Sequence, residues 1–509
     1  MDQNAEGTGR RACPGIVMKQ RSFHKGRSTR AARGQRQALL WKDFFMKIKM
    51  QIARLYGLEF LTAFGLAQVI WLALLAGRGF SLAQIGLAEG FFHLVSFLCE
   101  VPSGMIADLL GRKRTLVAAC LVRAAAALCM VASRGLLGVC GAMGLHAFSY
   151  NLISGTREAI TYDSLLAAGR TEEYERVAGR QSTIWRVTGA ACAVGTALTI
   201  ALGWRRAYCV DAAAALAGAL LAAGLTEPVV TQAQAARQTR ALAHFAARTR
   251  AHIAQSLGFL VQNPRAACKM LADGGSGCAA ALSVMLLQQY MIELGLPAAA
   301  LGLPLLIINL AGALGAALAP RLRLPFGRAA ALCVGGVACS VLLEGAPLLA
   351  LAVLGGAVAT FWDGVLEIKM TARLNQDFPS DQRATLVSVQ SMCYSLLMLP
   401  MSPLAGAVCG AAGTGAGIAL LGAGLALASG SGLAFGSWVG SGSWVGSGSS
   451  VGAGSSVGSG SSVGMLIDVP LLVAKAVGAK IVVSNIAANS PANSLLARFM
   501  FVPPFLFWI

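Results

Sequence analysis

Long apolar stretches separated by short polar links run through most of the chain. A helix needs about 20 apolar residues to cross the roughly 30 Å of hydrocarbon in a bilayer. The stretches are too long for strands and lack the alternation of apolar and polar residues that a membrane strand requires. The pattern predicts an all-α membrane protein with twelve transmembrane helices, at approximately residues 54–77, 82–107, 115–133, 136–156, 182–202, 206–225, 267–292, 298–319, 329–345, 347–368, 385–408 and 412–430.

The composition agrees with this pattern. Hydrophobic residues make up 56% of the chain and charged residues 12%, against about 25% charged residues in an ordinary soluble domain. The thirteen cysteines occur singly, and none has a Cys or His neighbour at metal-ligand spacing. We therefore expect neither a metal site, nor a cofactor, nor a disulfide framework.

Positive charge gathers on one side of the predicted spans. Of the net charge of +19, residues 1–54 contribute thirteen Lys or Arg against three acids, which favours a segment facing anionic lipid over a nucleic-acid-binding tail. With a cytoplasmic N-terminus, nineteen Lys or Arg fall in cytoplasmic links and four in the opposite links. This positive-inside bias predicts a multi-pass protein of the cytoplasmic membrane with both termini inside.

The link lengths divide the chain into two halves. The longest link follows six predicted spans and precedes six more. We suspect that Met46 or Met50 is the true start and that slippage in a Gly/Ser repeat changed the reading frame before the tail. The predicted organisation is a basic leader (1–50), a six-helix bundle (51–225), a central cytoplasmic loop with an amphipathic helix (226–266), a second six-helix bundle (267–430), a hexapeptide-repeat linker (431–464) and an atypical tail (465–509).

A basic turn follows the second predicted span, and its sequence is Gly104-Met105-Ile106-Ala107-Asp108-Leu109-Leu110-Gly111-Arg112-Lys113-Arg114. Gly104 and Gly111 are expected to allow a close backbone approach and a sharp turn. Asp108 can form a charge pair with Arg112 or Arg114 at the membrane boundary. A weaker echo over Gly315–Arg328 occupies the same place in the second half. Such an echo predicts duplicated bundles with a substrate site near mid-membrane between them.

Together with the twelve spans and the central loop, the turn resembles the major facilitator superfamily, whose loop between helices two and three carries G-x-L-A-D-R-x-G-R-K-R. The resemblance covers about residues 50–430 and implies a secondary transporter working by alternating access. It also implies that Asp108 and Arg112 form a gate latch, with Glu158 or Asp163 as candidate acidic partners. In the alternative, the basic residues only set topology. The chain matches the motif at Gly104, Ala107, Asp108, Gly111, Arg112, Lys113 and Arg114, and departs from it at Ile106 and Leu109.

Ionisable residues inside the spans are costly in lipid and are therefore candidates for function. Arg123 and Glu100 lie at similar distances from the turn, so we predict that they pair, either structurally or for transport. Glu59 could carry a proton if burial favours its neutral form, or could be a solvated gate residue. The candidates for charge or proton handling are Glu59, Glu89, His93, Glu100, Arg123 and His146, with Arg186, Asp211, Asp273 and Glu367 as further ionisable residues in the spans; the two histidines could equally be packing residues.

Several polar and aromatic residues could reach a substrate cavity. Gln68 lies on the first helix, which lines the cavity in the family that the chain resembles. Trp362 and Asp363 combine a flat apolar face with a carboxylate suited to a cation, although an interfacial pair is the alternative. The full set of cavity candidates is Gln68, Gln288, Tyr290, Asn309, Trp362, Asp363 and Gln390.

The sequence favours a monomeric secondary transporter for a small hydrophobic or amphipathic solute, because its Ala- and Gly-rich helices offer few fixed polar groups. Proton-coupled efflux is an option, although the G-x-x-x-G-P-x-x-G-G antiporter pattern and the fourth-helix arginine are missing. A sugar or metabolite uptake permease is the alternative within the same fold. The rival class is a membrane receptor or enzyme, but no nucleophile motif or convergent His and carboxylate set is visible, and we expect no enzymatic activity.

Overall fold

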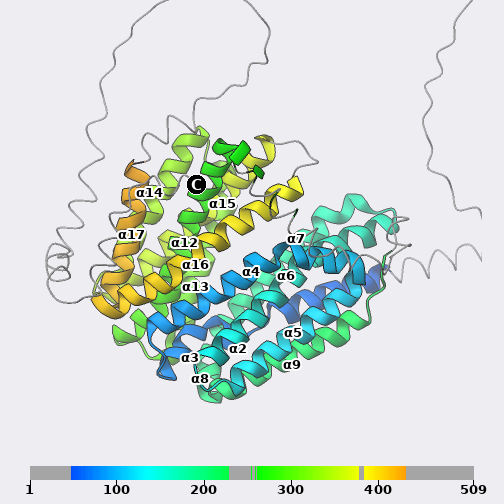
Figure 1. Ribbon diagram of the computed structural model, residues 1–509, viewed down its shortest axis with the longest axis horizontal. Helices are drawn as coiled ribbons and strands as arrows, with labels where there is room; N and C mark the ends of the chain where they lie inside the picture. Colours follow the sequence, from blue (N-terminus) through cyan, green and yellow to red (C-terminus); the bar gives the residue numbers. More distant parts are fainter. Residues whose placement is uncertain are drawn as a thin grey trace, which may run out of the picture. The chain divides into compact units, whose positions relative to one another are not determined.

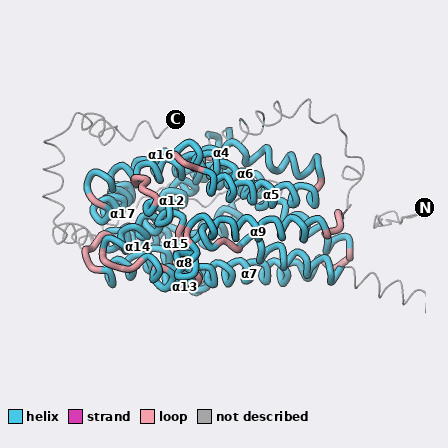
Figure 2. The backbone as a smooth tube through the Cα atoms, turned by 90° about the horizontal axis from the view of Figure 1, so that it is seen from below, coloured by secondary structure: helices cyan, strands magenta, loops and turns pink. Residues whose placement is uncertain are grey.

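The computed structural model describes most of the predicted membrane segments, with described residues 48–228, 251, 254, 258–259, 261–377 and 383–431. The chain divides into two units, residues 1–50 and 51–509, and all elements discussed below belong to the second unit. Regular structure within the described residues is entirely helical, as the sequence predicts (Figure 2). The predicted leader, central loop, linker and tail lie largely or wholly outside the described residues.

The first predicted span is a broken helix, with a helical segment over residues 51–63 followed by α2 (Leu66–Val69) and α3 (Trp71–Gly77). The first half continues with α4 (Leu82–Leu110), α5 (Arg112–Ala132), α6 (Leu136–Ala167), η1 (Thr171–Glu173), α7 (Tyr174–Val194), α8 (Thr196–Leu202) and α9 (Trp204–Ala223). The second half contains α12 (Pro264–Glu293), η3 (Ala298–Ala300), α13 (Gly302–Leu318), η4 (Ala319–Arg321), α14 (Phe326–Glu344), α15 (Leu349–Asp377), α16 (Arg383–Ala412) and α17 (Thr414–Ser431). The two halves form two groups of helices, and α4 and α16 lie side by side where the groups meet (Figure 1).

Nine helices in the described part of the chain are long and apolar enough to cross a bilayer, and the bent pair α7 and α8, at 54°, would make a tenth. The first predicted span does not qualify because of its break, and the apolar stretch of α17 is shorter, over Thr414–Ala428. Each of the twelve predicted spans coincides with helix, intact or broken. The number of twelve crossings and their orientation remain predictions.

Gly111 alone forms the turn that the sequence suggested over residues 104–114. α4 continues to Leu110, and Gly111 has a φ of +92°, a value that favours glycine. Gly104 lies inside α4, where an added Cβ atom would meet no atom within 4 Å. The predicted sharp turn at Gly111 is confirmed, whereas the predicted close approach at Gly104 is wrong because open space lies beside it.

The echo in the second half falls at the matching connection. α13 ends at Leu318, η4 follows, and α14 begins at Phe326. This connection is longer than the one at Gly111. Gly315 serves helix packing instead of a turn, because a Cβ atom there would collide with the carbonyl oxygen of Phe361 on α15.

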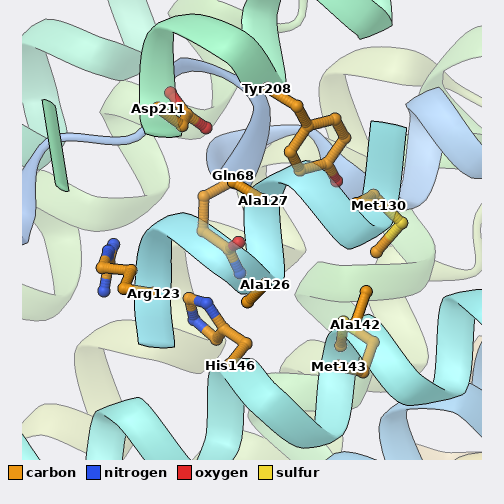
Figure 3. Close-up of a pocket in the computed structure, with 10 residues that line it drawn as sticks. All are labelled: Gln68, Arg123, Ala126, Ala127, Met130, Ala142, Met143, His146, Tyr208 and Asp211. Atoms are coloured by element: carbon orange, nitrogen blue, oxygen red, sulfur yellow. The ribbon is translucent and has the colours of Figure 1, made fainter. Parts of the chain in front are cut away.

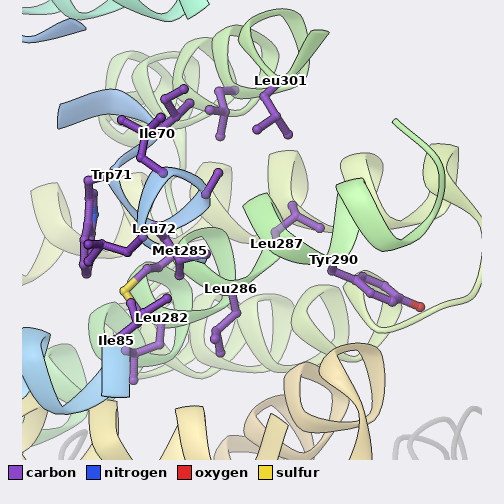
Figure 4. Close-up of a cluster of buried hydrophobic side chains, with 14 of the residues drawn as sticks. Ile70, Trp71, Leu72, Ile85, Leu282, Met285, Leu286, Leu287, Tyr290 and Leu301 are labelled. Carbon is purple, nitrogen blue, oxygen red and sulfur yellow. The ribbon is translucent and has the colours of Figure 1, made fainter. Parts of the chain in front are cut away.

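One buried apolar cluster connects the two halves at the end of the bundles where α3 leads into α4, here termed the joined end. The first half supplies Ile70, Trp71 and Leu72, and the second half supplies Leu286 and Leu301 (Figure 4). These side chains are buried away from lipid and water, and they pack the start of the second half directly against the broken first span. The joined end is therefore a shared core between the halves.

At the opposite ends of the same helices, here termed the separate end, each buried apolar cluster belongs to one half. Leu55, Leu116 and Ile160 lie in a cluster of the first half, and Met270 and Leu366 lie in a cluster of the second half. A smaller cluster on α5 and α6 also stays within the first half. Among the described residues, buried apolar clusters therefore connect the halves at the joined end only.

Glycines bring α4 and α16 into close contact at the joined end. A Cβ atom at Gly86 would collide with the carbonyl oxygen of Ser402, and one at Gly90 would lie 2.9 Å from the carbonyl oxygen of Leu399. Gly406 of α16 faces the start of α4 in the same way. Small residues at such positions let helix backbones approach each other, which is how helices in lipid gain packing energy.

Gly86→Ala should destabilise the protein, even though Ala in a helix interior is ordinarily favoured over Gly by about 0.5–1 kcal/mol. The added methyl group would force α4 away from α16. Gly104→Ala is the matched control, because it adds the same group to the same helix in open space. Thermal unfolding of the detergent-purified variants should give a lower midpoint for Gly86→Ala and an unchanged or higher one for Gly104→Ala. Equal midpoints would contradict the close packing.

Candidate functional site

Arg112, the first residue of α5, is bound to the end of α6. Its guanidinium forms an ion pair with Asp163, and Nη1 donates a hydrogen bond to the carbonyl oxygen of Ala159 at 2.6 Å. Of the two acids predicted as its partners, Asp163 contacts Arg112, whereas Glu158 is exposed. All of these contacts lie within the first half, so they fix α5 against α6 and do not by themselves connect the halves.

Glu227, which follows α9, binds the same turn. Its carboxylate oxygens accept hydrogen bonds from the backbone N–H groups of Arg112, at 2.9 Å, and Lys113, at 2.7 Å. An acid at this position satisfies free N–H groups at the start of α5 and suits the helix dipole. Arg114 is exposed. The side chain of Asp108 lies outside the described part of the structure, so its latch role remains a prediction.

Glu59 is buried against Arg157 of α6. Its Oε1 accepts a hydrogen bond from Nη1 of Arg157 at 2.7 Å, and its side chain is only 1% exposed. Its Oε2 is also buried and has no hydrogen-bond partner within the described residues. Glu59 is therefore not the solvated residue that the sequence allowed. Arg157 is one of the nineteen basic residues in the predicted cytoplasmic links, and the sequence gives no other sign of its role.

A small polar cavity of about 30 Å³ lies inside the first half (Figure 3). Gln68 of α2, Arg123 of α5 and His146 of α6 line it, together with Tyr208 and Asp211 of α9. A cavity of this size has room for about two water molecules beside polar side chains. Four residues that the sequence singles out thus share one site, and Tyr208 joins them without any signal in the sequence.

Asp211 holds the break in the first span. Its Oδ1 accepts a hydrogen bond from the N–H group of Leu66 at 2.7 Å, and its Oδ2 accepts one from Ala67 at 3.1 Å. These N–H groups begin α2 and have no helical partner, because the preceding helix ends at residue 63. Lipid offers no partner for such groups, and here a carboxylate from α9 binds them. Arg123 lies near enough to interact electrostatically with Asp211.

The predicted pair of Glu100 and Arg123 does not form. Arg123 lines the cavity, whereas Oε2 of Glu100 accepts a hydrogen bond from Oγ of Ser391 on α16 at 3.3 Å. The prediction assumed that α4 and α5 pack as a hairpin. In the structure α4 packs mainly against α16 and α6, and α5 packs mainly against α6 and α9. Equal distance from the turn therefore does not bring the two side chains together.

Polar side chains of α4 reach the second half beside the glycine contacts. Nε2 of His93 lies 3.4 Å from Oε1 of Glu89, one helical turn away. The ring of His93 packs edge-on against Tyr394 of α16, with ring centroids 5.6 Å apart. The candidates His93 and Glu100 thus both contact α16, which makes this region the junction of the halves.

Second-half acids lie at the same junction. Oδ2 of Asp273 on α12 accepts a hydrogen bond from Nε2 of Gln390 on α16 at 2.8 Å. Asp363 of α15 lies close to the backbone of α12, since a Cβ atom at Gly277 would be 3.7 Å from its Oδ1. The same atom would be 3.5 Å from Cε2 of Tyr394. The junction therefore contains the cavity candidates Gln390 and Asp363, and Tyr394, which the sequence analysis missed.

The other cavity candidates have packing or main-chain partners. Gln288 is buried and donates from Nε2 to a main-chain carbonyl of α2 at 3.2 Å. The hydroxyl of Tyr290 lies 3.0 and 3.1 Å from carbonyl oxygens of the connection between α14 and α15. Asn309 is exposed and bonds to its own helix at 2.8 Å. Trp362 packs against α14 and the ring of the preceding residue. We infer that these four shape the bundles.

The fold and these clusters together define a class of protein. Polar and ionisable side chains inside apolar helices, located where two helical bundles meet, are typical of secondary transporters. In the part of the chain that the structure describes, no group of three or more His, Cys, Asp or Glu side chains could hold a metal ion. The molecule is a multi-helix membrane transport protein.

Sequence comparison identifies its family. A family model described as Major Facilitator Superfamily matches residues 55–399, more than half of the chain. The chain belongs to the Major Facilitator Superfamily. No curated protein sequence matches it.

Solved structures with this fold include transporters of several kinds. The nucleoside transporter NupG is 14% identical, with a TM-score of 0.61, and the match covers 76% of this chain and 98% of that one. A POT family transporter in complex with 5-aminolevulinic acid is 11% identical, with a TM-score of 0.59 and coverage of 77% and 96%. A bacterial homolog of the human lysosomal transporter Spinster, in an inward-facing and occupied conformation, is 15% identical, with a TM-score of 0.56 and coverage of 76% and 92%. At these identities the likeness concerns the fold.

Asp211→Ala should lower the free energy of unfolding by about 2 kcal/mol or more, because it leaves two buried N–H groups without a charged acceptor. Asp211→Asn keeps one carbonyl oxygen as an acceptor and should cost less. Glu172→Gln, at an exposed acid in η1, is the control and should leave stability unchanged. Unfolding of the purified variants in detergent measures all three. An Asp211→Ala variant as stable as the original chain would show that the broken helix does not depend on this cap.

Proposed function

We propose that this protein is a secondary active transporter that moves a small hydrophobic or amphipathic solute across the cytoplasmic membrane by alternating access. Family membership supports transport in general. The observation that carries the mechanism is the difference between the two ends. One apolar cluster spans both halves at the joined end, while the clusters at the separate end each belong to one half. This difference supports a protein whose halves can part at the separate end while they stay packed at the joined end.

The positive-inside bias assigns the separate end to the cytoplasm and the joined end to the outside. In this orientation the structure represents an inward-facing state. The opposite state requires the shared core at the joined end to part while the halves meet at the separate end. Alternating access needs at least two discrete packings of rigid bundles. The solute and the driving ion select between them.

Arg112 and Asp163 act in this cycle by positioning the turn between α4 and α5. The pair ties the start of α5 to α6, and α4 on the other side of the turn packs against α16. The contact of Glu100 with Ser391 crosses between the halves. Movement of the turn is thereby transmitted to α16, and these polar contacts bias the protein toward one state.

Glu59 is the proposed proton carrier, and export in exchange for protons is the proposed direction. Its carboxylate is buried and bound to Arg157 through one oxygen, with the second oxygen unpartnered in the described residues. A proton on Glu59 would cancel the charge that holds Arg157, and breaking a buried ion pair is energetically strong enough to favour another packing.

Solute flux into proteoliposomes tests the proposal directly. Purified protein should move at least one amphipathic solute, faster with an imposed pH gradient and more slowly after an ionophore dissipates it. Glu59→Gln should lose the response to the pH gradient, because its side chain cannot exchange a proton. A well-folded preparation without flux for any solute in a broad panel would contradict transport, and flux indifferent to the gradient would contradict proton coupling alone.

Asp163→Asn should reduce the transport rate about tenfold, because Arg112 loses its charged partner at a part-buried contact. Glu158→Gln is the matched control on the same helix, since Glu158 is exposed, and should transport at nearly the original rate. Initial rates in proteoliposomes, normalised to inserted protein, give the comparison. Equal rates for the two variants would show that the basic residues of the turn only set the topology.

A further inference from the structure

Hydrogen-bond acceptors from both halves gather around Tyr394 at the junction. Its ring contacts His93 of α4 on one side and the backbone of α12 at Gly277 on the other. Asp363 of α15 lies beside the same point of α12. Residues of three helices thus surround the ring of Tyr394 on α16: α4 belongs to the first half, whereas α12 and α15 belong to the second half, as α16 does.

The ionisable groups at this junction are predominantly acidic. The charges of Glu89 and Asp363 both act on Tyr394, and those of Asp273 and Glu367 act on Asp363. In the described residues, none of the ion pairs within 4.0 Å includes Glu100, Asp273 or Asp363, and the neutral side chains of Ser391 and Gln390 bind Glu100 and Asp273. The ionisable side chains at the junction are therefore mainly acids.

The basic residues of α12 and α15 are Arg265, which is exposed, and Lys269, Lys369 and Arg373. Lys269 and Arg373 lie over the ring of Phe326 at the start of α14, with charge-to-centroid distances of 5.7 and 5.9 Å. Lys369 donates to the carbonyl oxygen of Leu322 at 2.8 Å. All three contact the connection between α13 and α14 at the separate end. These contacts of Lys269, Lys369 and Arg373 lie toward the separate end, away from the ring of Tyr394.

His93 adds an independent sign that a ligand belongs at the junction. The residue is 6% exposed, and its Nδ1 is buried with no hydrogen-bond partner in the described residues. Its Nε2 faces the carboxylate of Glu89, which can only accept a hydrogen bond when ionised. When Nε2 donates its proton there, Nδ1 presents a lone pair. A buried lone pair of this kind is satisfied only by a hydrogen-bond donor.

We propose that the junction around Tyr394 binds the transported solute and that this solute is an organic cation with a protonated amine. This inference rests on the proposed transport function and specifies its substrate class. A protonated amine supplies positive charge and several N–H donors to a junction whose ionisable side chains are mainly acids. The rings of Phe92, Tyr150 and Tyr394 would receive its apolar part and stabilise the cation. An anion lacks the positive charge, and a polyol supplies hydrogen-bond donors without that charge.

Binding of 2-phenylethylammonium, with 2-phenylethanol as a neutral probe of matched shape, tests the charge requirement. The full-length protein in lipid nanodiscs should be stabilised against heating by the amine in a concentration-dependent manner, since a ligand of the folded state raises its stability. The alcohol should bind at least about tenfold more weakly, because it carries no charge and fewer donors. Equal stabilisation by the two probes would overturn the inference. Stabilisation by sodium ions alone, with none by the amine, would also overturn it.

Variants locate the site. Asp363→Asn and Asp273→Asn should each weaken amine binding about tenfold or more, because each removes one negative charge from the junction. Glu172→Gln, at an exposed acid outside the junction, should bind like the original chain. Either junction variant suffices if the other fails to fold. Unchanged affinity in a folded junction variant would exclude this region as the amine site.

Flux separates this inference from the transport proposal. If the amine binds through Asp363 but no solute moves in proteoliposomes, the transport proposal fails and the site remains. If neutral solutes move while the amine neither binds nor moves, transport stands and the cation site fails. Joint success requires that the amine is transported and that Asp363→Asn slows its transport more than that of any neutral solute.

Discussion

Lipid gives a polar group no partner, and this constraint organises the interior of the protein. An N–H group at a helix break, or an ionised side chain between the helices, is costly unless the chain itself or a bound ligand supplies a partner. Asp211 therefore comes from α9 to bind the free N–H groups of α2, and Arg157 comes from α6 to pair with Glu59. These contacts join helices that the chain separates widely. They also stabilise the broken first span. An uninterrupted apolar helix would not need such contacts.

The same constraint distinguishes structural polar groups from groups available for function. Asp211 has both oxygens bound to the backbone, and Arg112 is held by an acid and a carbonyl. At the junction around Tyr394, by contrast, acceptors exceed donors. A membrane protein can tolerate such an excess of acceptors where a ligand or a proton binds to them. The bound state is then stable, and the unbound acceptors favour binding. Glycine contacts between α4 and α16 hold the two halves close enough for both to contribute to this junction.

Much of the fold could be predicted, because apolar length is a local property. The predicted spans coincide with helices, and Gly111 forms the expected turn between α4 and α5. The break before α2 could not be anticipated, because its N–H groups are bound by Asp211, which is 145 positions away from Leu66. Gly104 was misread as a close-approach site since only its neighbours in space, not its sequence motif, decide that role.

Contacts within the candidate site depend on which helices are adjacent, and sequence alone does not specify adjacency. Asp163 was predicted as a partner of Arg112 because the family resemblance supplied the neighbour. Glu100 was assigned to Arg123 by counting from the turn, but α4 and α5 diverge and Glu100 faces Ser391 instead. Tyr394 gave no signal at all, since an aromatic residue in an apolar span is usually a packing residue.

Distances between the two halves at both ends test the central claim that rigid bundles exchange which end is joined. Spin labels on unnatural amino acids would spare the thirteen native cysteines, with one pair at the exposed residues Arg114 and Arg323 of the separate end and another at Arg134 and Leu348 of the joined end. Pulsed dipolar spectroscopy in nanodiscs, with and without transported solute, should give two distance populations at each end. When the population with the shorter distance grows at one end, it should shrink at the other. A single unchanged distance at both ends under all conditions would contradict the account.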